Sequence, residues 1–209
     1  MNEPRICVVG TGALATRRIT PYIGTAGGRL VGLCDLEREK AELNARRYGG
    51  NVYTDMETML DAEKPDGVMI AIGPTPNARL ATQVMKRGIA VYTEKPPAGT
   101  AADALDVARV SAETGVLCTT AFKKRYNTAY SRAKEWIEKF DEADRYSIGI
   151  DYCSGQFSND TERMFFLLAF GIHIIDLVGY LFGDAADVFA FSKGVDAYAV
   201  SMRFASGAV

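Results

Sequence analysis

The sequence contains a single histidine, His173, among its 209 residues. One imidazole excludes every metal site built from two or more histidines, such as the HExxH and three-histidine zinc classes, and we expect no metal. The four cysteines, at positions 7, 34, 118 and 153, are too far apart in the sequence for a CxxC pair. Because the first three stand in apolar runs, we expect reduced thiols of a cytoplasmic protein and no disulfide framework.

Charge of one sign is not in excess, because 24 Lys and Arg residues are balanced by 26 Asp and Glu residues. The net charge of −2 gives no reason to expect a nucleic acid or an anionic membrane surface as a partner. With 48% hydrophobic residues, the chain can bury a core. The stretch from Met164 to Gly183 is long enough to span a bilayer, but His173 and Asp176 at its centre favour a buried helix.

Strand and helix patterns alternate over the first part of the chain. Apolar and β-branched runs predict strands at 5–9, 30–34, 51–53, 67–72, 89–93 and 115–119. Between them, helices are predicted at 13–26, 37–48, 56–62, 77–87 and 101–114. Pro21 should end or kink the first of these helices. Such alternation predicts right-handed crossovers and a parallel sheet.

The pattern changes after Phe122. Apolar residues at helical spacing predict an amphipathic helix over 126–140, and alternation predicts a half-buried strand over Arg145–Cys153. A loop at 154–160, an apolar helix at about 161–182, and strands at 188–192 and 197–205 follow. We therefore expect two domains, 1–122 and 123–209, the second with a mostly antiparallel sheet and helices on one face.

A glycine-rich motif, GTGALA at positions 10–15, follows the first predicted strand and opens a helix. Asp35 ends the second predicted strand, as the dinucleotide fingerprint requires. Gly10 permits the tight turn, and Gly12 lets a pyrophosphate approach the helix N-terminus. Asp35 can accept hydrogen bonds from both adenosine ribose hydroxyls. We predict a Rossmann domain that binds a nicotinamide dinucleotide; a plain βαβ turn with a capping aspartate is the alternative.

The charge at Asp35 bears on cofactor choice. Its carboxylate would lie where the 2′-phosphate of NADP lies, so repulsion favours NAD. Arg38 could offset this repulsion, which leaves NADP as the alternative. A second candidate, Lys95 in Thr93–Pro97, follows the fifth predicted strand, at the edge where ligands of open parallel sheets bind. Lys95 can donate to a substrate oxygen there; a solvated lysine in a proline turn is the alternative.

Taken together, several motifs make the chain resemble the glucose–fructose oxidoreductase / inositol dehydrogenase family, known as Gfo/Idh/MocA. Besides GTGALA they are CD at 34–35, GPTPN at 73–77, EKP at 94–96, KRYN at 124–127 and GIHIID at 171–176. The resemblance covers essentially the whole chain. It implies reversible hydride transfer between a nicotinamide and a secondary alcohol of a sugar, cyclitol or similar polyol.

The resemblance also assigns roles to residues. Lys95 would contact substrate, His173 would act as general base, and Asp176 would fix the imidazole tautomer. Cofactor contacts are implied for Gly10, Thr11, Gly12, Ala13, Leu14, Asp35, Ile72, Gly73, Asn77, Glu94, Lys95 and Arg125. A buried histidine bonded to Asp176 for packing alone, and an Arg125 that is only a surface charge, are the alternatives.

One departure from the family pattern matters. Catalytic members often carry an aspartate four residues before the histidine, where this chain has Ala169. A non-catalytic dinucleotide-binding regulator, or a reductase of a non-sugar substrate, therefore stays open. We also expect a homo-oligomer, a dimer or tetramer. Finally, the C-terminal sheet of the resembled family has more strands than are visible before Val209, so we expect the natural chain to be longer.

Overall fold

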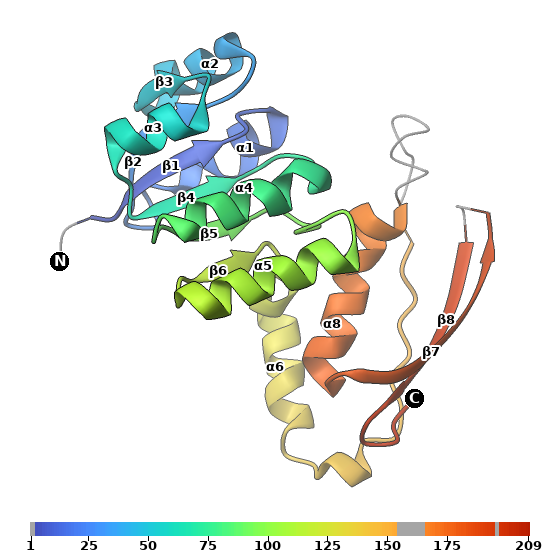
Figure 1. Ribbon diagram of the computed structural model, residues 1–209. Coiled ribbons are helices and arrows are strands. Elements are labelled where there is room, and N and C mark those ends of the chain that lie inside the picture. Colours follow the sequence, from blue (N-terminus) through green and yellow to red (C-terminus); the bar gives the residue numbers. More distant parts are fainter. Residues whose placement is uncertain (1–2, 154–165, 195–196) are drawn as a thin grey trace. The chain divides into compact units, whose positions relative to one another are not determined.

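The computed structural model describes residues 3–153, 166–194 and 197–209. The chain divides into two compact units, Met1–Ala121 and Phe122–Val209. In unit 1, the strands are β1 (Arg5–Val9), β2 (Arg29–Cys34), β3 (Asn51–Tyr53), β4 (Gly67–Ile70), β5 (Ala90–Thr93) and β6 (Cys118–Thr120). All pairings are parallel, in the order β3-β2-β1-β4-β5-β6 (Figure 1). The predicted Rossmann sheet is thereby confirmed.

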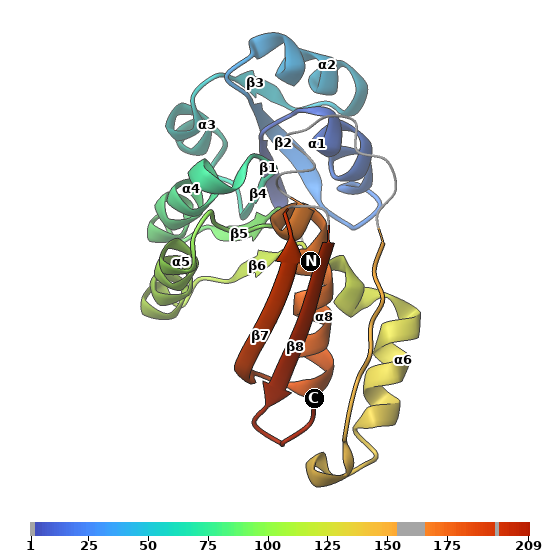
Figure 2. The same cartoon turned by 90° about the vertical axis from the view of Figure 1, so that its right-hand side faces the viewer.

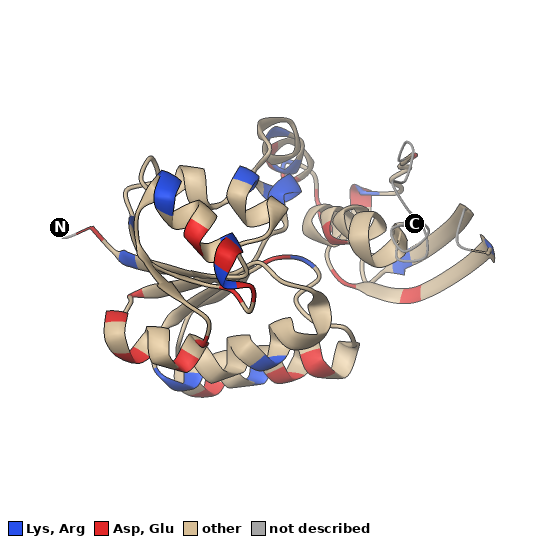
Figure 3. Cartoon of the chain, turned by 90° about the horizontal axis from the view of Figure 1, so that it is seen from above, with Lys and Arg blue, Asp and Glu red and all other residues tan. Residues whose placement is uncertain are grey.

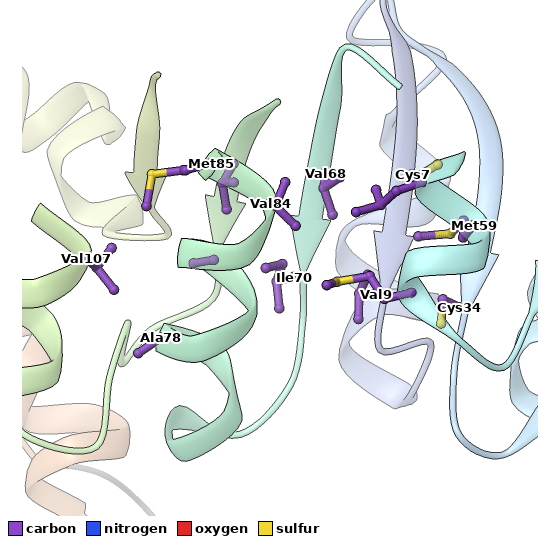
Figure 4. Packing of buried hydrophobic residues seen from close by; sticks show 14 of the residues in the cluster. Cys7, Val9, Cys34, Met59, Val68, Ile70, Ala78, Val84, Met85 and Val107 are labelled. Carbon is purple, nitrogen blue, oxygen red and sulfur yellow. The ribbon is translucent and has the colours of Figure 1, made fainter. Parts of the chain in front are cut away.

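Helices cover both faces of this sheet. They are α1 (Ala13–Arg18), the 3₁₀ turn η1 (Thr20–Tyr22), α2 (Arg38–Tyr48), α3 (Met56–Glu63), α4 (Pro74–Lys86) and α5 (Ala101–Thr114). Side chains alternate along each strand, so Val8 and Leu33 pack with α1, α2 and Ile23, the residue after η1. Cys7, Val68 and Ile70 point the other way, into a core shared with α3, α4 and α5 (Figure 4).

Boundaries shift from the predicted ones where proline or glycine acts. The first helix ends at Arg18, and Pro21 falls in η1, because proline cannot donate to the preceding turn. Helix α4 begins at Pro74, earlier than predicted, since a first-turn proline has no N–H to satisfy. Gly115 adopts φ +67° as the C-cap of α5, so β6 starts only at Cys118.

The order of strands and helices leaves part of one face of the sheet without a covering helix from unit 1. The crossovers that lead from β3 to β6 place α3, α4 and α5 on the same face. On the opposite face, an open groove of about 390 Å³ lies beside α1 and η1. Its lining is mostly apolar and includes Ile6, Ile19, Tyr22, Met69, Tyr92 and Leu117. Helices α2 and α5 each carry residues of both charges, whereas α1 and α4 carry only Lys or Arg and α3 only Asp or Glu (Figure 3).

Unit 2 contains η2 (Lys123–Tyr126), α6 (Thr128–Ile137), η3 (Glu142–Asp144), the π-helix η4 (Leu167–Gly171) and α8 (Ile172–Phe182). Two antiparallel strands follow, β7 (Ala185–Lys193) and β8 (Ala197–Phe204) (Figure 2). The predicted loop 154–160 and the first residues of the predicted apolar helix lie outside the described residues. Among the described helices, none has the length and apolarity needed to cross a membrane.

The strand predicted over Arg145–Cys153 is wrong. Among the described residues this segment forms no regular strand, and the backbone bonds that join it to residue 209 are Ile148 N to Val209 O and Val209 N to Tyr146 O, both 3.0 Å. Alternation of apolar and polar residues reports which side chains are half-buried, whereas a strand also requires a partner that continues the ladder.

Candidate functional site

The glycine-rich loop leaves β1 with a geometry that requires glycine. Gly10 has φ +83°, and a Cβ there would lie 2.4 Å from Ile72 Cγ2 and 2.5 Å from the Ala71 oxygen. A Cβ on Gly12 would meet nothing within 4 Å, so space is open beside this residue. Gly12 is the N-cap of α1, whose first-turn amides have no acceptor within the helix. This arrangement fits the approach of a dinucleotide pyrophosphate.

Asp35 lies next to this loop and is already engaged by the chain. Its Oδ2 accepts hydrogen bonds from Thr11 N at 2.7 Å and Thr11 Oγ1 at 3.1 Å, and its Oδ1 accepts one from Glu37 N at 3.0 Å. A carboxylate offers about four acceptor positions. Three are in use and at least one stays open for a ribose hydroxyl; the contact of Asp35 with both ribose hydroxyls stays a prediction.

A buried polar group supports the loop from α2. Asn44 is fully buried, and its Nδ2 donates to Thr11 O at 3.0 Å, Thr16 Oγ1 at 2.9 Å and Lys40 O at 3.0 Å. Thr16 Oγ1 in turn lies 3.0 Å from Gly12 O. Asn44 was not among the site residues predicted from the sequence. The sequence feature that could have identified Asn44 is a polar residue between Ala41 and Ala45, on the face of α2 that is buried.

Sheet register brings the candidate residues of unit 1 to one edge. Val9 is paired with Cys34 and with Ile70, and Ile70 is paired with Thr93. The residues that follow these strand ends are therefore the glycine loop, Asp35, the 71–73 turn and the Glu94–Lys95 segment. In open parallel sheets this carboxyl edge is where ligands bind.

The segment that carries Lys95 is fastened to its neighbours by backbone groups. Glu94 N donates to Ile70 O at 2.9 Å, and Lys95 N donates to Glu94 Oε2 at 3.2 Å. The peptide bond between Lys95 and Pro96 is cis. Asn77 is fully buried and donates to this segment, while its predicted contact with the cofactor stays a prediction. Gly73 is the N-cap of α4, while Ala13 and Leu14 are exposed on α1.

In unit 2, Arg125 and Asp176 form the principal charged contact between η2 and α8. Arg125 Nε lies 3.0 Å from both carboxylate oxygens, and Nη2 lies 2.6 Å from Oδ1. These bonds raise the pKa of Arg125. Within the described residues, all hydrogen bonds to the Asp176 carboxylate come from Arg125. The structure thus pairs Asp176 with Arg125 and not with His173 as expected.

His173 lies in the first turn of α8 and is buried. It follows directly on the π-helix η4, which contains Ala169. Departures from α-helical geometry of this kind are frequent at functional sites. Since Lys95 and His173 belong to different units, their meeting in one active site stays a prediction, as do the catalytic roles assigned to them.

Relatives of known activity support the fold and its class. Residues 4–122 match the model of an oxidoreductase family with an NAD-binding Rossmann fold. D-apiose dehydrogenase of Paraburkholderia graminis is 26% identical over 196 residues, covering 90% of this chain and 52% of that protein. Inositol 2-dehydrogenase of Rubrobacter xylanophilus is 30% identical over 132 residues, covering 62% and 38%. The chain therefore spans about half the length, or less, of these curated relatives.

Solved structures agree in fold. The WlbA dehydrogenase of Bordetella pertussis, solved in complex with NADH and UDP-GlcNAcA, has a TM-score of 0.85 at 21% identity, covering 99% of this chain and 65% of that one. The myo-inositol 2-dehydrogenase of Lactobacillus plantarum has a TM-score of 0.82 at 21% identity, covering 99% and 68%. The family match spans more than half of the sequence, and the glycine loop and Asp35 lie where its fold requires. The chain belongs to the Gfo/Idh/MocA oxidoreductase family, with its NAD-binding Rossmann fold.

Proposed function

We propose that the protein is an NAD-dependent dehydrogenase acting on a secondary alcohol of a sugar, cyclitol or similar polyol, or on the matching ketone. The observation that carries the proposal is the register of β1, β2, β4 and β5, which aligns the glycine loop, Asp35 and Lys95 along one sheet edge. Relatives named as sugar and inositol dehydrogenases support the substrate class. Residues 1–122 would bind the dinucleotide, and 123–209 would contribute to substrate binding and to a dimer or tetramer.

Each candidate residue has a separate role in the proposed reaction. Bound nicotinamide supplies the hydride acceptor. Thr11, Gly12 and the first turn of α1 hold the pyrophosphate, while Asp35 accepts a hydrogen bond from the adenosine ribose. Lys95 Nζ holds the substrate oxygen and stabilises negative charge that develops on it. His173 takes the hydroxyl proton as general base, a role to which a neutral imidazole nitrogen is suited.

The test is a titration followed by a substrate screen. NAD and NADP are titrated separately, and the preferred dinucleotide is then offered with a panel of polyols, sugars and their ketones. We expect tighter binding of NAD and growth or loss of the reduced-nicotinamide absorbance with at least one polyol–ketone pair. Turnover with non-sugar carbonyl compounds alone would assign the chain to a different substrate class.

A second function, a dinucleotide-binding regulator without chemistry, is favoured by one residue. Ala169 presents a methyl group where catalytic members often carry a carboxylate that can orient the histidine. Under this alternative NAD binds, no compound in the screen turns over, and Ala169→Asp creates no activity. If the dehydrogenase proposal holds, Ala169→Asp should change the turnover or its pH profile, because a carboxylate four residues from His173 lies on the same helical face.

A further inference from the structure

We propose that Asn77 is a positioning residue, which holds the backbone on both sides of Lys95 so that the lysine is presented in one conformation. The effect of Asn77 on turnover rests on the proposed function, whereas the effect of Asn77 on the backbone around Lys95 does not. The inference goes beyond the cofactor contact that the resemblance implied for this residue.

The contacts of Asn77 are directed at one short segment. The residue lies in the first turn of α4 and is 0% exposed. Its Nδ2 donates to Glu94 O at 2.9 Å and to Pro96 O at 3.3 Å. These carbonyls belong to the residues immediately before and after Lys95. A single side-chain amide thus ties both flanks of the lysine to the start of a helix.

The hydrogen bonds of the sheet cannot hold the backbone on both sides of Lys95. The β5 ladder ends with the bond from Glu94 N to Ile70 O. Pro96 and Pro97 have no N–H and cannot extend it. An NH₂ group is suited to the position because it has two donors for two carbonyls. Glutamine has the same group but is longer by one methylene, which a fully buried site does not accommodate without strain.

The carbonyl oxygen of the Asn77 side chain indicates that close packing alone does not explain an asparagine at this position. Its Oδ1 is buried and has no hydrogen-bond partner among the described residues. Burying such an acceptor is unfavourable, and an apolar residue would avoid it. Asn44 has the same pattern, with a donating Nδ2 and a buried Oδ1 for which the described residues supply no partner. Because Asn44 holds the glycine loop and not Lys95, it is a matched control.

The first experiment needs no activity. Amide hydrogen exchange is measured on the unliganded protein and on the Asn77→Ala, Asn77→Ser and Asn44→Ala variants. In Asn77→Ala we expect exchange at Glu94 and Lys95 to be about tenfold faster or more. Asn77→Ser, which keeps one donor, should fall between Asn77→Ala and the unmodified protein. Asn44→Ala should instead accelerate exchange in residues 11–16. Unchanged exchange at 94–95 in Asn77→Ala would overturn the inference.

The second experiment uses the turnover of the proposed reaction. For Asn77→Ala we expect kcat to fall by about 10–100-fold, as displacement of a catalytic group causes, with the Kd for NAD changed by less than about twofold. Asn77→Asp places carboxylate oxygens against two carbonyls at neutral pH. When protonated, the carboxyl can donate again, so the activity of Asn77→Asp relative to the unmodified protein should rise as the pH is lowered.

The outcomes separate the two proposals. A kcat within about twofold of the unmodified protein in both Asn77→Ala and Asn77→Asp contradicts the positioning role. So does a relative activity of Asn77→Asp that does not depend on pH. If the unmodified protein turns over no polyol but Asn77→Ala loosens residues 94–95, the proposed function fails and the positioning of Lys95 by Asn77 stands.

Discussion

At the scale of single residues, Asp35 has two tasks whose effects can be separated. Its carboxylate accepts hydrogen bonds from Thr11 of the glycine loop, and it places negative charge where we propose that the adenosine ribose binds. We expect Asp35→Ser to narrow the difference between the Kd values for NAD and NADP, because the charge is removed. The same change should also weaken NAD binding, because Thr11 N loses its acceptor. Fluorescence titration with both dinucleotides measures these effects.

Arg38 provides the control for this prediction. Its Nε lies 2.9 Å from Glu42 Oε1 on the exposed side of α2, so its charge is locally paired. Arg38→Ala should leave the preference for NAD within about twofold of that of the unmodified protein. Equal or tighter binding of NADP by the unmodified protein would contradict the assignment of Asp35.

Lys95 and His173 carry the proposed chemistry, and each can be removed alone. Lys95→Ala and His173→Ala should lower kcat by about 10²–10⁴-fold, the usual effect of losing a positioned acid or base. The Kd for NAD should change little, since both act on the substrate oxygen. Lys86→Ala, at the exposed end of α4, is the matched lysine control. Near-full activity of His173→Ala across pH would make the histidine structural.

At the scale of elements, Glu63 at the end of α3 joins three parts of unit 1. It accepts hydrogen bonds from Tyr53 Oη at 2.6 Å, Asn51 Nδ2 at 2.7 Å and Arg5 Nη2 at 3.1 Å. Burial raises the pKa of the Glu63 carboxyl, but these three partners outweigh burial and lower it below 4.5. The hydrogen bond to Glu63 is the main cause that raises the pKa of Tyr53 to about 12.

This network predicts a pH-dependent stability. A carboxyl whose pKa is lowered by folding stabilises the fold above its unfolded pKa, and that contribution is lost as the pH falls through the folded pKa. Tyr53→Phe should therefore reduce the free energy of unfolding by about 1–3 kcal/mol at pH 7, and by less at a pH below the folded pKa of Glu63, where the carboxyl is protonated. Urea denaturation at both pH values measures the difference. Tyr48→Phe, at the surface end of α2, should have no comparable effect; equal losses at both pH values would contradict the role of Glu63.

The elements also show what sequence patterns can and cannot provide. The ranges of β1, β3 and α5 were predicted correctly, because apolar runs and turn residues are local properties. Most partners of Asn77, Asn44 and Asp176 were not predicted, because these partners lie 17 to 51 residues away and are reached only after the fold forms. Asp176 illustrates this. Helical spacing predicted a contact between Asp176 and His173, but in the folded protein the Asp176 carboxylate bonds to the guanidinium of Arg125.

At the scale of the whole molecule, the thiols differ in accessibility. Desolvation by burial raises the pKa of Cys7 to about 12 and that of Cys34 to about 11, and it also raises the pKa of Cys118. Cys153 is exposed. Because the thiolate is the reactive form, a thiol reagent at neutral pH should modify Cys153 first, the half-buried Cys118 more slowly, and the buried Cys7 and Cys34 only on unfolding. Cys153→Ser should abolish the fast phase; a second fast thiol in the native protein would contradict the burial of the core cysteines.

The strand order has a consequence for how the chain is assembled during synthesis. β1 lies between β2 and β4, so its two edges are completed at different times. Strands β2 and β3 are synthesised before β4. The edge of β1 that pairs with β4 therefore has no partner until Gly67–Ile70 has left the ribosome. A nascent chain with β1, β2 and β3 therefore passes through a stage with an open central strand, at which pairing with another nascent chain competes with correct folding.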